Sequence, residues 1–186
     1  MPASHPASLP DGTAVYVLTV SDGVAAGVRE DRSGEVIASR LVALGADVRR
    51  SVVADDIELI AAAILDAARD HAIVVTTGGT GLTPRDVTPQ ATRSVLSYEI
   101  PGLAEAMRAA GRVSTPLADL SRAVVGVVGR ALVINVPGSP AGAAESLAAI
   151  EPVLAHAIAT LAGPHDHDVA RGSGRVAYDP GQESGT

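Results

Sequence analysis

The stretch that decides the fold is Ile73-Val74-Val75-Thr76-Thr77-Gly78-Gly79-Thr80-Gly81-Leu82-Thr83-Pro84-Arg85-Asp86-Val87-Thr88-Pro89. It opens with an apolar, β-branched run, which predicts a buried strand. Three glycines follow, and their backbone N–H groups can approach an anion closely because no side chain stands in the way. Thr88 as a helix cap and Pro89 at the first helical position then predict a helix. A strand, a glycine turn and a helix start together indicate a phosphate site at the carboxyl edge of a sheet.

Two common phosphate loops are excluded by this stretch. A P-loop needs a lysine after its last glycine, and the chain contains no lysine. The dinucleotide pattern fails because Pro84 stands where the third glycine of G-x-G-x-x-G would fall. A plain tight turn is the simpler alternative, but three glycines and an acidic residue together with the threonines Thr76, Thr77 and Thr80 favour a functional loop.

The composition suits one α/β domain. The chain has 186 residues, 47% of them hydrophobic, yet it contains no Phe and no Trp. Its core must therefore consist of aliphatic side chains, which suits helices packed on a sheet. A net charge of −7 and an aromatic content of 2% argue against a nucleic-acid partner.

Several other classes are also excluded. The absence of cysteine rules out disulfides, thiolate metal sites and cysteine nucleophiles. The first 13 residues lack the features of a signal peptide, and no apolar run approaches the ~18 residues of a membrane span, so we expect a soluble, cytoplasmic protein without a membrane partner.

Outward from the central loop, the pattern predicts a folded domain at 14–163 between flexible ends at 1–13 and 164–186. In the second of these, His165-Asp166-His167-Asp168 resembles a metal tag, although a solvated charged stub is the favoured reading. The other expected strands are 14–20, 48–53, 123–128 and 131–136, the last two joined by a type II′ turn at Gly129-Arg130. Helices are expected from Asp31 to Gly45, from Asp56 to Ala67, and at 88–96, 102–110, 140–150 and 151–161, with one turn at 117–120.

This order predicts an open sheet that is parallel in its first part, with the hairpin adding an antiparallel pair. Polar residues follow four of the strands, at Ser21-Asp22, Asp55-Asp56, Thr77–Asp86 and Asn135–Ser139. If those strands run the same way, the four segments meet at the edge where open α/β sheets bind ligands.

The chemistry of these segments points to charge neutralisation. Any one of Asp22, Asp55, Asp56 and Asp86 is more commonly a cap or turn residue than a metal ligand. Beside a glycine loop that holds phosphates, however, carboxylates need a cation such as Mg²⁺.

Other polar groups complete this picture. Ser121-Arg122 offers a phosphate clamp, and Asn135 offers an amide to a ring or an anion. The motifs contain no histidine, and without lysine no Schiff base can form. Phosphoryl or nucleotidyl transfer, which depends on positioning, is the reaction class that fits.

These motifs together resemble the MoaB/Mog family of molybdenum cofactor biosynthesis. The likeness covers roughly residues 15–162 and rests on motifs that occur in the family's order: Ser21-Asp22-Gly23, Thr76–Gly81, Arg85–Pro89, Pro101-Gly102, Ser121-Arg122 and Asn135–Pro140. A receiver-like or flavodoxin-like domain is a remote alternative, because a receiver needs a lysine and flavin sites usually offer aromatic faces.

The resemblance implies a three-layer α/β/α sandwich that assembles as a trimer or a hexamer. It also implies a molybdopterin adenylyltransferase, which transfers AMP from Mg-ATP to the terminal phosphate of molybdopterin and releases pyrophosphate. A downstream molybdenum insertase is the implied partner. An inactive MoaB-type oligomer that only binds molybdopterin is the alternative, and the sequence does not decide between molybdenum and tungsten pathways.

The family's catalytic, metal-binding acids correspond here to Asp55 and Asp86, with Asp56 left open as the alternative to Asp55. The resemblance also places Glu105 near the pterin. With the residues argued above, the predicted substrate-binding set is Ser21, Asp22, Thr77, Gly78, Gly79, Thr80, Gly81, Glu105, Ser121, Arg122, Asn135, Pro137, Gly138 and Ser139.

Overall fold

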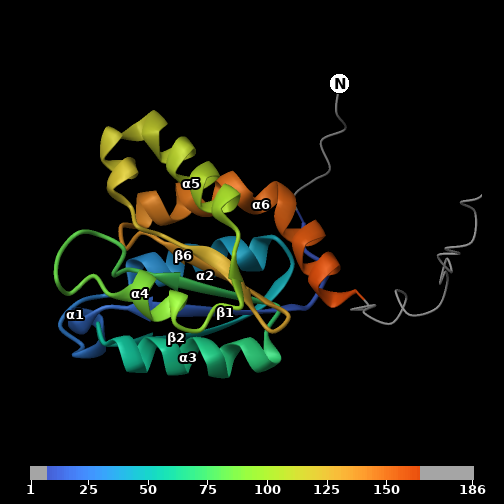
Figure 1. The fold of residues 1–186 in the computed structure, drawn as a ribbon, viewed down its shortest axis with the longest axis horizontal. Coiled ribbons are helices and arrows are strands. Elements are labelled where there is room, and N and C mark those ends of the chain that lie inside the picture. Colours follow the sequence, from blue (N-terminus) through green and yellow to red (C-terminus); the bar gives the residue numbers. More distant parts are fainter. Residues whose placement is uncertain (1–7, 164–186) are drawn as a thin grey trace, which may run out of the picture.

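The computed structural model describes residues 8–163 and contains a six-stranded sheet in the order β2-β1-β3-β6-β5-β4 (Figure 1). The first four strands of this order are parallel, and β5 and β4 are antiparallel to their neighbours. The strands are β1 (Thr13–Val20), β2 (Ala46–Val53), β3 (Ile73–Thr77), β4 (Tyr98–Glu99), β5 (Val125–Val128) and β6 (Ala131–Val136). The predicted parallel sheet with an added antiparallel hairpin is confirmed.

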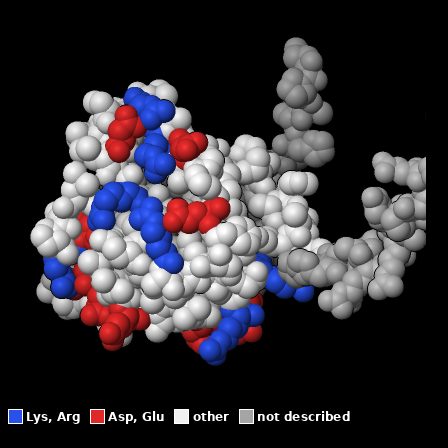
Figure 2. All heavy atoms as spheres, viewed as in Figure 1, with Lys and Arg blue, Asp and Glu red and all other residues white. Residues whose placement is uncertain are grey.

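Helices cover both faces of the sheet, so the three-layer sandwich is also confirmed. On one face lie α2 (Arg32–Ala43), α5 (Pro101–Ser114) and α6 (Pro140–Ala162), and on the other lie α3 (Ile57–Asp70) and α4 (Thr88–Arg93). Each layer contact is made by aliphatic side chains such as Leu41 and Ile64, which are fully buried. Short α1 (Asp22–Ala25) and the 3₁₀ helix η1 (Pro116–Leu120) complete the fold. Acidic and basic side chains are interspersed on the face shown in Figure 2.

The edge strand β4 was not predicted from the sequence. Only Tyr98 and Glu99 form it, both exposed, so it shows no apolar alternation from which a strand is recognised. Gly126 on the neighbouring β5 permits this pairing, because a Cβ there would lie 2.5 Å from the carbonyl oxygen of Tyr98. The hairpin turn was predicted correctly in that its leading residue, Gly129, has a positive φ of 58°.

Three helices run farther than predicted, and the first of them, α3, ends at Asp70 and not at Ala67. Helix α5 continues through Gly111 to Ser114, and Gly111 is where η1 packs closely, since a Cβ there would lie 2.8 Å from Cβ of Ala118. The two C-terminal helices predicted at 140–150 and 151–161 are one 23-residue helix, α6, with Pro152 in its interior. Proline interrupts one backbone hydrogen bond but does not end the helix, because the apolar side chains on both sides of it pack in the same core.

Helix α6 also corrects the expectation that no segment reaches membrane-spanning length. By length and composition alone it could cross a bilayer. However, Leu147, Ile150 and Leu154 on α6 are buried in the core beside the sheet. Such packing is what a core helix of a globular domain shows, so α6 is read as part of the fold.

The N-terminal segment is fixed closer to the start of the chain than predicted. Leu9 is 4% exposed and joins the core, and its N–H donates to the carbonyl of Leu44 at 2.8 Å. The predicted flexible lead therefore does not extend to residue 13. The predicted tail at 164–186, with its His-Asp pairs, lies outside the described residues.

Candidate active site

The four polar segments predicted to meet do lie at one edge of the sheet. They follow β1, β2, β3 and β6, which are neighbouring parallel strands. Backbone bonds join them: the N–H of Ser21 donates to Val53 at 3.0 Å, and the N–H of Gly78 donates to Val136 at 3.2 Å. The hydroxyl of Thr77 adds a 2.8 Å bond to the carbonyl of Pro137. The carboxyl edge is thus the candidate site.

The glycine turn at this edge owes its shape to two residues with positive φ. Gly78 has φ 101° and Gly79 has φ 63°. Their close neighbours leave no space for a side chain, since a Cβ on Gly78 would lie 2.3 Å from the carbonyl oxygen of Val20. Thr88 fixes the turn, because its hydroxyl donates to Gly78 at 2.9 Å and its N–H donates to Gly79 at 3.1 Å.

This use of Thr88 corrects the prediction that it caps the helix. Val87 is the residue at the cap position of α4, and no side chain makes the capping bond. Thr88 is fully buried and its hydroxyl points back to the glycine turn. Thr88 therefore connects the turn to the helix that follows it.

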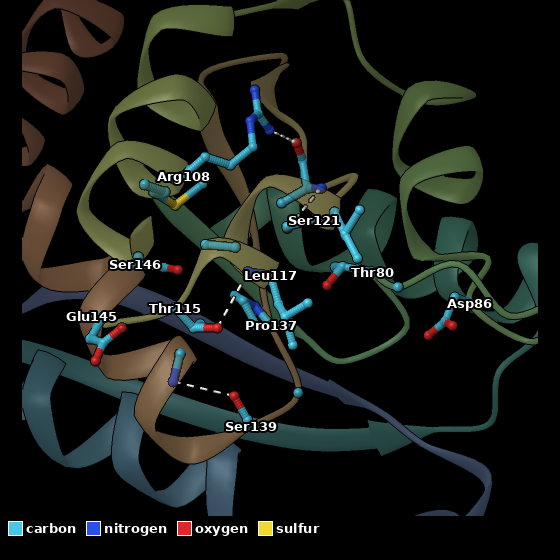
Figure 3. Close-up of a pocket in the computed structure, with 18 of the residues that line it drawn as sticks. Thr80, Asp86, Arg108, Thr115, Leu117, Ser121, Pro137, Ser139, Glu145 and Ser146 are labelled. Atoms are coloured by element: carbon cyan, nitrogen blue, oxygen red, sulfur yellow. Dashed lines mark hydrogen bonds between the residues drawn. The ribbon is translucent and has the colours of Figure 1, made fainter. Parts of the chain in front are cut away.

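Two cavities flank the turn and share Gly79, Asp86 and Gly138. The first, of about 560 Å³, lies among α5, η1 and the start of α6 and is called the α5–α6 cavity (Figure 3). Its lining includes Thr80, Gly81, Leu82, Ala104, Met107, Arg108, Leu117, Ser121, Pro137, Ser139, Glu145 and Ser146. The second, of about 980 Å³, is called the β1–α2 cavity. Its lining includes Ser21, Arg29, Arg32, Ser33, Asp55, Thr77, Gly78, Thr83 and Arg85.

The structure distinguishes the two neighbouring aspartates after β2. Asp56 caps α3, and its Oδ1 accepts the N–H groups of Glu58 and Leu59, each at 3.0 Å. Asp55 instead faces the glycine turn, since a Cβ on Gly79 would lie 3.3 Å from its Oδ1. Asp55 is therefore the candidate for the site, and the predicted capping role of Asp56 is confirmed.

Asp86 lies against Gly81 of the same turn, and it lines the β1–α2 cavity together with Asp55. Its Oδ2 accepts the N–H of Thr83 at 2.8 Å, and a Cβ on Gly81 would lie 3.0 Å from that oxygen. Burial raises the pKa of Asp86, but hydrogen bonds from Thr83 and Gly81 and the charge of Arg122 outweigh it and hold the pKa below its ordinary value. Asp86 is consequently an anion at neutral pH.

These two carboxylates are oxygen ligands of the kind that a magnesium ion takes in proteins. Mg²⁺ in proteins is usually held by one or two carboxylates together with substrate phosphates and water. Between residues 8 and 163 no cluster of three or more acidic or histidine side chains forms a complete metal site. Asp55 and Asp86, which face the turn at Gly79 and Gly81, provide the two-carboxylate part of such an arrangement.

Asp22 and Asp55 hold each other in place. The N–H of Asp22 donates to Oδ2 of Asp55 at 2.8 Å, and the N–H of Asp55 donates to Oδ1 of Asp22 at 3.0 Å. Arg85 completes the group with a 2.6 Å bond to Oδ2 of Asp22. Asp22 therefore acts through Asp55 and Arg85, and it does not line either cavity itself.

This group makes a prediction about pH. The hydrogen bond from Arg85, and then the N–H of Asp55, hold the pKa of Asp22 below its ordinary value of 3.8. A lowered pKa in the folded protein means that the pair stabilises the fold above pH 3.8 and loses this effect as pH falls through the lower value. We expect Arg85→Ala to move the Asp22 midpoint up toward 3.8 in a carboxyl NMR titration. An unchanged midpoint would show that the two side chains are not paired in solution.

Arg122 differs from its predicted role as a phosphate clamp. Its Nε donates to the carbonyl of Gly81 at 2.7 Å, and one terminal nitrogen donates to the carbonyl of Asp86. The backbone N–H of Arg122 donates to the carbonyl of Thr80 at 3.0 Å. A guanidinium can satisfy orphan carbonyls in this way, so Arg122 holds the loop that carries Asp86. Ser121 beside it lines the α5–α6 cavity as expected.

Asn135 also differs from its prediction. It is fully buried, its Oδ1 accepts the N–H of Val124, and its Nδ2 donates to the hydroxyls of Thr76 and Thr92. All of these partners belong to the protein, so the amide does not face a ligand. Asn135 instead joins three elements beneath the site.

A substitution tests this structural role. Asn135→Ala leaves the buried N–H of Val124 without a partner, which costs about 1–3 kcal/mol. For a domain of this size we expect Tm to fall by about 2–4 °C per kcal/mol, measured by calorimetry. Lost turnover with an unchanged Tm would instead support the predicted ligand contact.

The structure places Glu105, the glutamate predicted to lie near the pterin, outside both cavities. Glu105 on α5 is exposed and lies outside the α5–α6 cavity, because the buried face of the helix carries Ala104 and Met107 instead. The glutamate in that cavity is Glu145, from α6. Sequence reasoning missed Glu145 because it stands in an alanine-rich helix with no motif around it.

Comparison with known proteins agrees with this geometry. A family model described as a probable molybdopterin binding domain matches residues 16–156. The chain is 42% identical over 163 residues to the molybdenum cofactor biosynthesis bifunctional protein of Synechococcus elongatus, an alignment that covers 87% of this chain and 51% of that protein. The chain thus spans about half the length of that relative.

Two further matches span most of both chains. The molybdopterin adenylyltransferase of Helicobacter pylori strain J99 is 36% identical over 154 residues, covering 80% of this chain and 88% of that protein. The crystal structure of the molybdopterin biosynthesis enzyme MoaB from Thermus thermophilus is 45% identical, with a TM-score of 0.74, covering 80% of this chain and 96% of that one. The chain therefore belongs to the molybdopterin-binding MoaB/Mog family.

Proposed function

We propose that this protein is a molybdopterin adenylyltransferase that acts in molybdenum cofactor biosynthesis. The observation that carries this proposal is that two cavities share the glycine turn and Asp86. Two substrates bound on either side of the turn would bring their phosphates together there. The relative from Helicobacter pylori is named for this activity.

The reaction requires no covalent bond between the protein and its substrates. An oxygen of the terminal phosphate of molybdopterin forms a bond to the α-phosphorus of ATP, and the bond from that phosphorus to the bridging oxygen breaks. Pyrophosphate leaves, and the product is adenylylated molybdopterin. Catalysis then depends on holding both phosphates in line and on neutralising their charge.

The described side chains suit these tasks. Asp55 and Asp86 would hold the Mg²⁺ that accompanies ATP, which neutralises phosphate charge when bound. The N–H groups of Gly78 and Gly81 are used by Val136 and Asp86, so the N–H of Gly79 and the hydroxyl of Thr80 are the groups that would contact phosphate oxygens. Arg85, whose side chain is 65% exposed and lines the β1–α2 cavity, can leave Asp22 for the triphosphate.

We assign ATP to the β1–α2 cavity and molybdopterin to the α5–α6 cavity. The first cavity is lined by Arg29, Arg32 and Arg85 together with four acidic residues, a set that suits a triphosphate accompanied by a cation; the acidic residues are Glu30, Asp31, Asp55 and Asp86. The second is lined by apolar side chains such as Met107 and Leu117, which suit the faces of a flat ring system.

Incubation with Mg-ATP and molybdopterin tests the proposal. We expect pyrophosphate release that depends on both substrates, and adenylylated pterin detected by mass spectrometry. Molybdopterin binding without pyrophosphate would instead identify an inactive binding protein.

Self-association is a further part of the proposal. Val113, near the end of α5 and outside both cavities, is an apolar side chain that is 90% exposed. Such a side chain suits contact with another copy, and a trimer or hexamer is expected by light scattering. We also propose cytoplasmic action, where ATP is available, and transfer of the product to a molybdenum or tungsten insertase.

A further inference from the structure

We propose that Glu145 recognises the hydrogen-bond donors of the pterin ring and so orients molybdopterin with its phosphate toward Asp86. The inference rests on the proposed function, because it concerns how the α5–α6 cavity recognises molybdopterin. No sequence motif includes Glu145.

Glu145 is held at one end of the cavity. It is partly buried on the second turn of α6, and the hydroxyl of Ser114 at the end of α5 donates to its Oε1 at 2.7 Å. Glu145 and Asp86 lie at opposite ends of the view in Figure 3, with Thr80 and Leu117 between them. A ligand that reaches from one carboxylate to the other would therefore pass over an apolar wall.

The carboxylate keeps acceptor capacity for a ligand. A glutamate has four lone-pair positions, and Ser114 occupies one of them. No arginine forms an ion pair with Glu145 in the part of the chain that the structure describes. The basic residue that lines this cavity, Arg108, directs Nη1 to the carbonyl of Ala123 at 3.3 Å.

The hydrogen-bonding groups of the pterin and adenine rings decide which ring suits the Glu145 end of the cavity. A carboxylate only accepts hydrogen bonds. The pterin ring presents two donors side by side, the ring N–H at position 3 and the amino group at position 2. Adenine presents its amino group beside N1, which is an acceptor and would be repelled. Glu145 therefore favours the pterin over the adenine ring of ATP.

The test measures steady-state kinetics of Glu145→Gln with each substrate varied in turn. Glutamine is nearly the same shape, but its amide presents a donor to one of the two ring donors. Since hydrogen bonds to charged groups contribute about 1.5–3 kcal/mol, we expect KM for molybdopterin to rise about 10- to 100-fold. We expect KM for ATP to stay within about twofold, and kcat at saturating pterin likewise.

Glu58→Gln is the matched control, because it makes the same change on an exposed residue of α3 that lines neither cavity. It is expected to leave both KM values unchanged. A direct measurement of molybdopterin affinity by quenching of pterin fluorescence, without ATP, should show the same loss for Glu145→Gln and none for Glu58→Gln. Thermal melting of both variants checks that the fold is intact.

The outcomes separate this inference from the proposed function. An unchanged pterin affinity in Glu145→Gln, or a rise in KM for ATP alone, overturns the inference while pyrophosphate release by the unaltered protein upholds the function. If the unaltered protein binds molybdopterin but releases no pyrophosphate, the function fails and the affinity measurement still decides the role of Glu145. If it binds no molybdopterin, both are wrong.

Discussion

Asp86→Asn is expected to reduce pyrophosphate release at saturating substrates by at least about 100-fold, the effect typical of losing one preorganised electrostatic contact. The carboxylate lines both cavities and is ionised at neutral pH, and under the proposed mechanism it would hold a magnesium ion between two phosphates. The amide of asparagine keeps an oxygen that can accept the N–H of Thr83 but loses the charge. Molybdopterin binding and Tm should therefore change little.

Asp56→Asn is the matched control for this loss of charge. Asp56 precedes α3 and caps it, and asparagine caps a helix as well as aspartate does. We expect its turnover to equal that of the unaltered protein, whereas Asp55→Asn should fall with Asp86→Asn. Near-normal turnover by Asp86→Asn would remove Asp86 from the mechanism.

Gly78→Ala is expected to lower the free energy of unfolding by about 2–5 kcal/mol. A residue with a side chain at φ 101° pays about 1–2 kcal/mol in strain. In addition, its Cβ would lie 2.3 Å from the carbonyl oxygen of Val20, and relieving such overpacking costs about 1–3 kcal/mol. Neither β1 nor β3 can shift easily, because both lie in the middle of the sheet. Calorimetry should show a Tm lower by about 2–4 °C per kcal/mol.

Gly102→Ala is the control for adding a methyl group. Gly102 lies in the first turn of α5, with no heavy atom within 4 Å of the position a Cβ would take. Alanine is the better helix former, so we expect Tm to stay equal or rise slightly. Equal stability of Gly78→Ala and Gly102→Ala would mean that the turn is not the rigid structure described.

The sheet and its functional edge follow from the sequence because both depend on local patterns. Short aliphatic runs bounded by turn residues, such as 131–136, predict buried strands, and their bounds were predicted closely. Parallel neighbours place their carboxyl ends together, so the meeting of Ser21, Asp55, Gly78 and Pro137 required no contact information. Most of the residues placed correctly follow a strand, whereas Ser121, which lines the α5–α6 cavity, follows η1.

The errors concern residues whose partners are distant in sequence. Arg122 bonds to carbonyls 41 and 36 positions away, and Asn135 bonds to a hydroxyl 59 positions away. Residue type alone suggests a ligand contact for both, whereas the packing uses their donors internally. Pro152 was expected to divide α6, but burial on both sides of it outweighs one missing hydrogen bond. The contacts of these residues depend on tertiary packing, which the periodicity of the sequence does not predict.

A structure with molybdopterin, Mg²⁺ and α,β-methylene ATP bound tests the shared-turn arrangement most directly. In this analogue a carbon replaces the oxygen whose bond must break, so both substrates persist. We expect one ligand in each cavity, with the terminal phosphate of molybdopterin and the α-phosphate of the nucleotide facing each other at Gly79 and Asp86. Both ligands in one cavity, or phosphates bound away from the glycine turn, would contradict the proposed mechanism.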